Sequence, residues 1–105
     1  MAYTRTDNGE KTMLNIDGTL DAVSAPELRP TLDAVVAEGC KEIIVDLSNL
    51  RLIDSSGVGV LVSLFKRVRA NGGDVRLIGM RDQPLAIFKL LRLDRVFPGQ
   101  AGLPG

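Results

Sequence analysis

Short apolar runs, each typical of a β-strand, alternate along the chain with longer segments in which apolar residues recur at helical spacing. The apolar runs lie at residues 13–16, 43–47, 52–53 and 74–79. The first run is expected to turn at Gly18. Because nearly every position of residues 43–47 is apolar, this run predicts a central strand that is covered on both faces. Asn8 and Gly9, which precede the first run, form a strong hairpin signal and predict a short edge strand before it.

Three segments carry the helical spacing. They are residues 24–39, with Leu28, Leu32, Val35 and Val36 in register; residues 58–69, with Val58, Leu61, Phe65 and Val68; and residues 82–93, with Leu85, Phe88 and Leu91. Ser24 and Glu27 have the spacing of a capping box, and Asp82 is expected to cap the last helix. Pro30 is expected to bend the first helix, or the helix to start later than Ser24, because proline lacks an amide hydrogen. Residues 71–73 are expected to end the second helix.

The alternation of strands and helices predicts an α/β fold, with a four- to five-stranded mixed, largely parallel sheet and three helices. A chain of 105 residues is long enough for one domain, which is expected to occupy residues 1–105 with its core at residues 12–97. Residues 95–97 are expected to form a last strand or an extended segment. Residues 98–105, rich in glycine and proline, are expected to form a flexible tail.

Charge and composition narrow the classes of function. Lys and Arg number 13 and balance 13 Asp and Glu, so no overall field attracts nucleic acid or a membrane. Residues 55–105 carry an excess of basic residues, but these are spread over separate elements. Because aromatic residues make up only 4% of the chain, this excess favours a solvated face over a nucleic-acid surface. The sequence shows no signal-peptide pattern and no apolar run near the ~20 residues of a membrane span. With the single cysteine, these features predict a cytoplasmic protein without membrane insertion.

Two counts restrict the chemistry. The chain has no histidine and one cysteine, so it can form neither a Ser-His-Asp or Cys-His triad nor a histidine-ligated zinc site. We therefore expect no catalytic residue, no metal site and no cofactor. The cysteine, Cys40, is expected to be a small, half-buried filler.

Residues 54–59, Asp-Ser-Ser-Gly-Val-Gly, are the strongest candidate for chemistry. A serine nucleophile would need a base, and the chain has no histidine to supply one. The glycines do not complete a Walker loop or a dinucleotide fingerprint, because Val62 stands where a further glycine is needed. Three interpretations remain open. The segment is a helix cap, a phosphorylation site at a helix start that tolerates a phosphate, or part of a receiver-like site in which an aspartate at a strand end, Asp46, accepts phosphate. Otherwise Asp46 is expected to pair locally.

Several features in a fixed order resemble the STAS domain of bacterial anti-sigma factor antagonists. They are residues 18–21 (Gly-Thr-Leu-Asp), the strand at residues 45–47, residues 54–59, the turn at Gly72 and Gly73, and residues 93–97 (Leu-Asp-Arg-Val-Phe). The resemblance runs from about residue 12 to residue 97. It implies a four- or five-stranded sheet with helices packed against it.

The resemblance also implies a partner and a switch. It implies that the chain binds an anti-sigma factor that is also a serine kinase, that this kinase phosphorylates Ser55, and that a separate phosphatase resets the switch. The unphosphorylated chain would then hold the anti-sigma factor and release sigma. The implied partner-binding residues are Asp21, Asp54, Ser55, Ser56, Gly57, Val58 and Gly59. Ser56 would be the neighbouring helix cap. A constitutive STAS scaffold that is never phosphorylated is a further alternative.

Overall fold

The computed structural model describes residues 2–93, so the segment expected at residues 95–97 and the tail expected at residues 98–105 lie outside the described residues. The described elements are β1 (Ala2–Asn8), β2 (Lys11–Leu20), α1 (Ala25–Ala37), β3 (Glu42–Asp46), β4 (Leu50–Ile53), α2 (Ser55–Ala70), β5 (Asp74–Ile78) and α3 (Asp82–Leu90). After an initial hairpin, strands and helices alternate as predicted.

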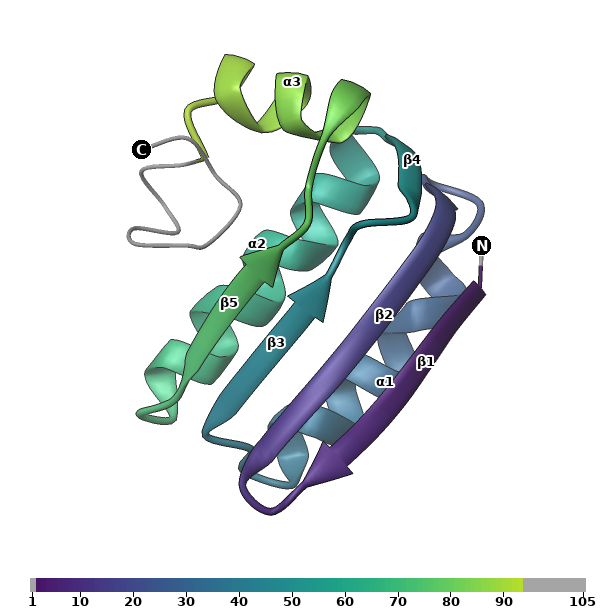
Figure 1. The fold of residues 1–105 in the computed structure, drawn as a ribbon. Helices are drawn as coiled ribbons and strands as arrows, with labels where there is room; N and C mark the ends of the chain where they lie inside the picture. The colour runs from purple at the N-terminus through teal and green to yellow at the C-terminus, as the bar shows by residue number, and fades with distance from the viewer. Residues whose placement is uncertain (1, 94–105) are drawn as a thin grey trace.

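The described strands form one mixed sheet (Figure 1). In spatial order β1, β2, β3 and β5 lie side by side, and β4 pairs with the last part of β2. The β1–β2 pair is antiparallel, whereas the β2–β3, β2–β4 and β3–β5 pairs are parallel. The structure therefore confirms the α/β class, the three helices and the largely parallel five-stranded sheet.

Two glycines shape the first two strands. β1 and β2 form the predicted hairpin, in which Asn8 pairs with Lys11 and Gly9 takes a φ of 65° in the turn between them. The predicted turn at Gly18 is wrong, because β2 continues to Leu20. Gly18 instead lies where the pairing partner of β2 changes from β3 to β4, with a register shift and a φ of 85°. Glycine adopts this left-handed conformation without steric cost.

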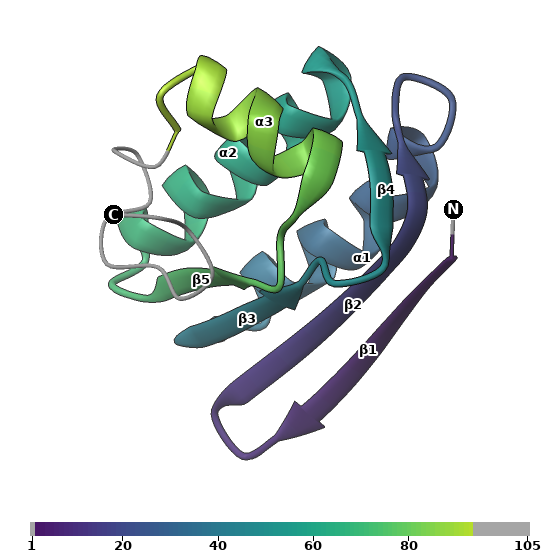
Figure 2. The same ribbon diagram turned by 45° about the horizontal axis from the view of Figure 1, so that its top comes forward.

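Helices α1 and α2 cover one face of the sheet, and α3 packs against β4 at one end (Figures 1 and 2). Burial along β3 alternates accordingly: Ile43 and Val45 are fully buried, whereas Ile44 between them is only partly buried. The prediction that this strand is covered on both faces is therefore wrong for the described part of the chain. Side chains of a strand point alternately to the two faces, so Ile44 lies on the face without helices.

The core fills the layer between the sheet and the two long helices. Its members include Leu14, Ile16, Ile43, Val45, Val75 and Leu77 from the strands, and Leu28, Leu32, Val35, Leu61, Leu64 and Val68 from α1 and α2. Fully burying a side chain of this size stabilises a fold by about 1.5–3 kcal/mol, so this layer is the main source of stability. Phe88, also fully buried, anchors α3 to the same core. Leu91, predicted for the same face, follows the last residue of α3 and is 50% exposed.

The start of α1 differs from the predicted capping box. The helix begins at Ala25, after Ser24, and continues through Pro30. Ser24 makes no side-chain capping bond within α1, so the predicted pairing with Glu27 is wrong. The Ser24 hydroxyl instead donates to the Thr19 carbonyl at 2.8 Å, and this bond anchors the loop before α1 to the end of β2.

The start of α3 is also held differently from the prediction. Asp82 is not its cap but its first residue, with a φ of 54° that is uncommon for a residue other than glycine. Arg81 precedes it as the N-cap and makes no side-chain capping bond. The Gln83 side chain fixes the helix instead, because it accepts a hydrogen bond from the Ile53 N–H at 2.9 Å and donates one to the Ile53 carbonyl at 3.0 Å. This pair of bonds links α3 to the end of β4.

Candidate partner-binding and phosphorylation site

Two segments that are distant in the sequence meet beside the start of α2. Residues 21–24 connect β2 to α1, and Asp54 connects β4 to α2. The Asp54 N–H donates to the Leu20 carbonyl at 3.2 Å, and Asp54 Oδ2 accepts from the Ala22 N–H at 3.3 Å. These bonds bring together the two segments that contain Asp21 and Asp54, both of which the family resemblance implies to be partner-binding residues.

Asp54 is the N-cap of α2. Its backbone is extended, with φ −114° and ψ −174°, and its Oδ1 accepts from the Gly57 N–H at 3.0 Å. The prediction that Ser56 caps this helix is wrong, because α2 already begins at Ser55 and Ser56 is its second residue. The cap is the residue just before the first helical one, and from there its side chain reaches the amide three residues on.

Ser55 is the first residue of α2 and is exposed. No described residue forms a hydrogen bond with its hydroxyl. A helix start leaves backbone amides without intrahelical partners and carries the positive end of the helix dipole. A phosphate on Ser55 would therefore find favourable amides nearby and, at the same time, add negative charge beside the Asp54 carboxylate.

The carboxylate of Asp21 holds the loop between β2 and α1. Its Oδ1 accepts from the Val23 N–H at 3.0 Å and from the Ser24 N–H at 2.9 Å. The Ser24 hydroxyl in turn accepts from the Asp21 N–H at 2.9 Å. The bond from the Ser24 amide, helped by the Ser24 hydroxyl and the Val23 amide, lowers the pKa of the Asp21 carboxyl below its ordinary value. Asp21 is therefore charged at neutral pH, and Val23, 84% exposed, forms an apolar tip beside it.

The glycines and the valine of the predicted site lie in different environments. Gly57 and Val58 are buried, whereas Gly59 is exposed. A Cβ at Gly57 would lie 2.5 Å from the Leu20 carbonyl oxygen, so glycine lets α2 approach β2 closely at this point. A Cβ at Gly59 would meet nothing within 4 Å. Gly57 and Val58 thus lie beneath the surface of the site, whereas Gly59 lies on its surface.

The remaining candidate groups of the sequence are held by local contacts. Asp46 pairs locally, as predicted: its Oδ1 accepts from the Ser48 N–H at 2.9 Å and from the Ser48 hydroxyl. Cys40 is partly buried, as predicted, and its Sγ accepts from the Thr12 hydroxyl at 3.4 Å. Within residues 2–93, no three residues of the types His, Cys, Asp and Glu are placed to hold a metal ion. None of the helices in this part of the chain is long and apolar enough to cross a membrane.

These features define a small two-layer α/β domain that presents a serine at a helix start. The STAS domain family model matches residues 2–103, and the chain belongs to this family. Among curated relatives, the anti-sigma-B factor antagonist of Bacillus subtilis (strain 168) is 31% identical over 86 residues, which is 82% of this chain and 78% of that protein.

Solved structures of the same fold extend the comparison. An anti-sigma factor antagonist from Mycobacterium paratuberculosis is 23% identical, with a TM-score of 0.84 over 96% of this chain and 84% of that one. The Bacillus cell fate determinant SpoIIAA, in its phosphorylated form, is 20% identical, with a TM-score of 0.77 over 99% of this chain and 92% of that one. At these identities the two structures establish the fold that the chain shares.

Proposed function

We propose that the chain is an anti-sigma factor antagonist that works by partner switching. In its unphosphorylated form it binds an anti-sigma factor, which is also a serine kinase, and sigma is released. Phosphorylation of Ser55 by that kinase ends the binding, and a separate phosphatase restores it. The chain is the substrate of these enzymes rather than an enzyme, and it acts in the cytoplasm.

The observation that carries the proposal is the position of Ser55. It is an exposed serine at the first position of a 16-residue helix, next to the capping carboxylate of Asp54. A phosphate there adds about −1.5 to −2 charges at pH 7. Because the helix start tolerates this charge, the folded chain keeps its shape while its surface potential changes. A partner surface packed against Ser55, above all an acidic or apolar one, would then be repelled.

The surface around Ser55 suits a binding partner. Asp54 and Gly59 are exposed, and Asp21 and Ser56 are partly exposed. Asp21 lies on the loop before α1, Asp54 is the N-cap of α2, and Ser56 and Gly59 lie in the first turns of α2. The relatedness to the Bacillus subtilis antagonist supports the choice of an anti-sigma factor as the partner.

Phosphosite mapping tests the modification. The full chain is incubated with ATP and the anti-sigma factor kinase isolated by pull-down from the native organism, and the product is mapped by mass spectrometry. We expect one phosphate, on Ser55, abolished by Ser55→Ala and kept by the matched control Ser56→Ala. A phosphate on Ser56 alone, or an alkali-labile acyl phosphate on Asp46, would contradict the proposal and favour a receiver-like site.

Binding measurements test the switch. We expect Ser55→Asp to weaken binding to the kinase and Ser55→Ala to retain it. A coupling of about 1–3 kcal/mol corresponds to a difference of about 5- to 150-fold in affinity. Equal affinities of the two variants, with no effect of ATP on the wild type, would instead identify a constitutive STAS scaffold.

A further inference from the structure

One apolar side chain is exposed on the surface beside Ser55. Val23, in the loop between β2 and α1, is 84% exposed, the largest value among the large apolar side chains of residues 2–93. The Ala22 N–H donates to Asp54 Oδ2, and this bond holds the loop against the start of α2. Figure 2 shows the loop and the start of α2 side by side. Val23 and Ser55, each one residue away from this bond, therefore belong to the same part of the surface.

The backbone of this loop is fixed within the chain. The Val23 and Ser24 amides both donate to Asp21 Oδ1. The Ala25 N–H donates to the Asp21 carbonyl at 2.7 Å, and the Asp21 N–H donates to the Ser24 hydroxyl at 2.9 Å. Together with the bond to the cap of α2, these contacts satisfy every backbone donor of residues 21–25. The loop therefore needs no hydrogen bond from a partner to hold Val23 in its exposed position.

The helix start beside the loop presents only small groups on one face. Ser55 and Gly59 are both exposed and lie one turn apart on the same face of α2. A Cβ at Gly59 would meet nothing within 4 Å, so this face borders open space. A partner can approach the helix closely here, and Val23 is an apolar group next to that contact.

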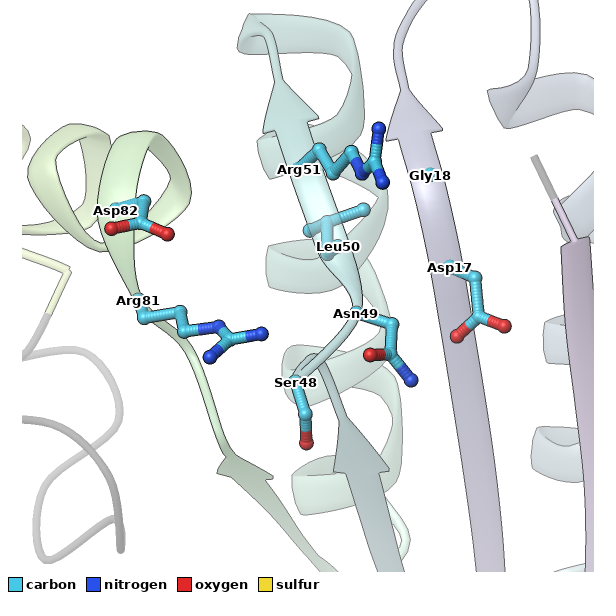
Figure 3. A pocket seen from close by; sticks show the side chains of 8 residues that line it. All are labelled: Asp17, Gly18, Ser48, Asn49, Leu50, Arg51, Arg81 and Asp82. Carbon is cyan, nitrogen blue, oxygen red and sulfur yellow. The ribbon is translucent and has the colours of Figure 1, made fainter.

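A cavity of about 690 Å³ lies at the other end of β4 from Ser55 (Figure 3). Its lining carries two guanidinium groups, those of Arg51 and Arg81, and two carboxylates, those of Asp17 and Asp82. Because these charges balance, the cavity favours neither an anionic nor a cationic partner. The contact with a partner is therefore assigned to the end of β4 where Ser55 lies.

We propose that Val23 is the apolar anchor of the partner contact and enters an apolar pocket of the anti-sigma factor kinase, next to the place where Ser55 is bound. This inference rests on the proposed function and names the chemistry of the partner surface. Because the loop is already ordered, burying the Val23 side chain costs little conformational entropy. An apolar surface cannot solvate a phosphate, so phosphorylation of Ser55 beside the pocket opposes binding through desolvation as well as through charge.

Calorimetric titration of the full chain with the purified kinase, in the absence of ATP, tests the proposal. The probe is the kinase that phosphorylates the wild-type chain in the mapping experiment above. Val23→Thr keeps the shape of the side chain but replaces a methyl group by a hydroxyl group. We expect this variant to bind the kinase at least about tenfold more weakly, because an apolar pocket leaves the hydroxyl group without a hydrogen-bond partner.

Leu90→Thr is the matched control. Leu90 is 75% exposed and is the last residue of α3, the helix whose start is bound to β4 through Gln83. The control variant should bind the kinase with the affinity of the wild type. Since both substituted side chains are largely exposed, neither change should lower the stability of the fold, and thermal unfolding of the two variants verifies this.

Nuclear magnetic resonance of the full chain, with labelled valine and leucine methyl groups, locates the contact directly. We expect the Val23 methyl signals to shift and broaden when the kinase is added. The methyl signals of Leu90, and those of Leu50 in the cavity of Figure 3, should stay unchanged.

Three results would overturn this inference and leave the proposed function intact. They are an unchanged affinity of Val23→Thr although Ser55→Asp binds weakly, equal weakening by Leu90→Thr, and methyl shifts at Leu50 without shifts at Val23. Equal affinities of the wild type and Ser55→Asp would instead contradict the proposed function, and this inference with it.

Discussion

The two oxygens of Asp54 serve segments that are far apart in the sequence. Oδ1 caps α2 at Gly57, and Oδ2 binds the Ala22 amide, 32 residues away. One side chain thus fixes both the helix start that presents Ser55 and the loop beside it. A substitution at this position should therefore affect stability as well as binding.

We expect Asp54→Ala to lower the free energy of unfolding by about 1 kcal/mol, within the 0.5–2 kcal/mol typical of a lost N-cap. Ser56→Ala, two residues further on, should change it by less than about 0.5 kcal/mol because Ser56 does not cap the helix. Urea unfolding at equilibrium measures both values. A larger loss for Ser56→Ala than for Asp54→Ala would contradict the assignment of the cap.

The loop around Asp21 should be sensitive to acid. The pKa of Asp21 in the folded chain lies below its value in the unfolded chain. The main cause is the hydrogen bond that the Ser24 amide donates to the Asp21 carboxylate. Its contribution to stability is therefore fully present above the unfolded pKa, about 3.9, and is lost as the pH falls through the folded pKa. A titration followed by the Asp21 carboxyl carbon and the Val23 and Ser24 amides should give a midpoint below the ordinary aspartate value of about 3.9, because the pKa of Asp21 is lowered in the folded chain. A midpoint at or above this value would show that the loop bonds do not favour the charged form.

At the scale of elements, the close approach of α2 to the sheet depends on Gly57 and not on Gly59. Gly57 faces the Leu20 carbonyl at the end of β2, whereas Gly59 faces open space. Because a backbone oxygen cannot move aside cheaply, a side chain at the first position pushes the helix away from the sheet. A side chain at Gly59 meets no other atom, so its only effect is to remove the conformational freedom of glycine.

We expect Gly57→Ala to destabilise the fold by about 1–3 kcal/mol, as overpacking does. Gly59→Ala should leave stability unchanged or raise it by up to about 1 kcal/mol, because alanine favours the helix over glycine. Thermal or urea unfolding of the two variants provides the comparison. Equal destabilisation would show that α2 does not approach β2 as closely as described.

The sequence predicted these elements well because each depends on its own periodicity. The apolar run at residues 43–47 identified β3, but it could not show which faces are covered, since that depends on the packing of α1 and α2. The capping residues were predicted less well. Ser24 fits a capping box by spacing, yet its hydroxyl binds the Thr19 carbonyl, a partner that only the folded loop supplies.

The same contrast between local and long-range features applies to the functional residues. Asp54 and Ser55 are adjacent in the sequence, so a local motif was sufficient to find them. In contrast, the cavity lined by Asp17, Asn49 and Arg81 is formed by segments that only the folded sheet brings together, and no spacing in the sequence indicates it. Similarly, the burial of Gly57 follows from the contact of α2 with β2, which the motif alone does not reveal.

For the molecule as a whole, the two-layer arrangement should produce a gradient of local stability. β3 pairs on both sides, with β2 and β5, and lies over the core, whereas β1 is a largely exposed outer strand. We expect the Ile44 and Val45 amides to exchange with solvent only on global unfolding. Amides of β1 that are paired with β2 should exchange faster, through local opening. Hydrogen exchange measured by nuclear magnetic resonance provides the test, and uniform protection of β1 and β3 would contradict it.

The helical conformation of Ser55 has a consequence for the enzyme that would modify it. The backbone of Ser55 is held in the first turn of α2, which the Asp54 side chain caps, so the acceptor serine does not lie in an extended segment. Under the proposed function, the kinase therefore has to recognise a three-dimensional epitope formed by the loop before α1 together with α2. A linear peptide of residues 51–61 lacks that epitope and should be a poor substrate, so phosphorylation would report only on molecules that have already folded.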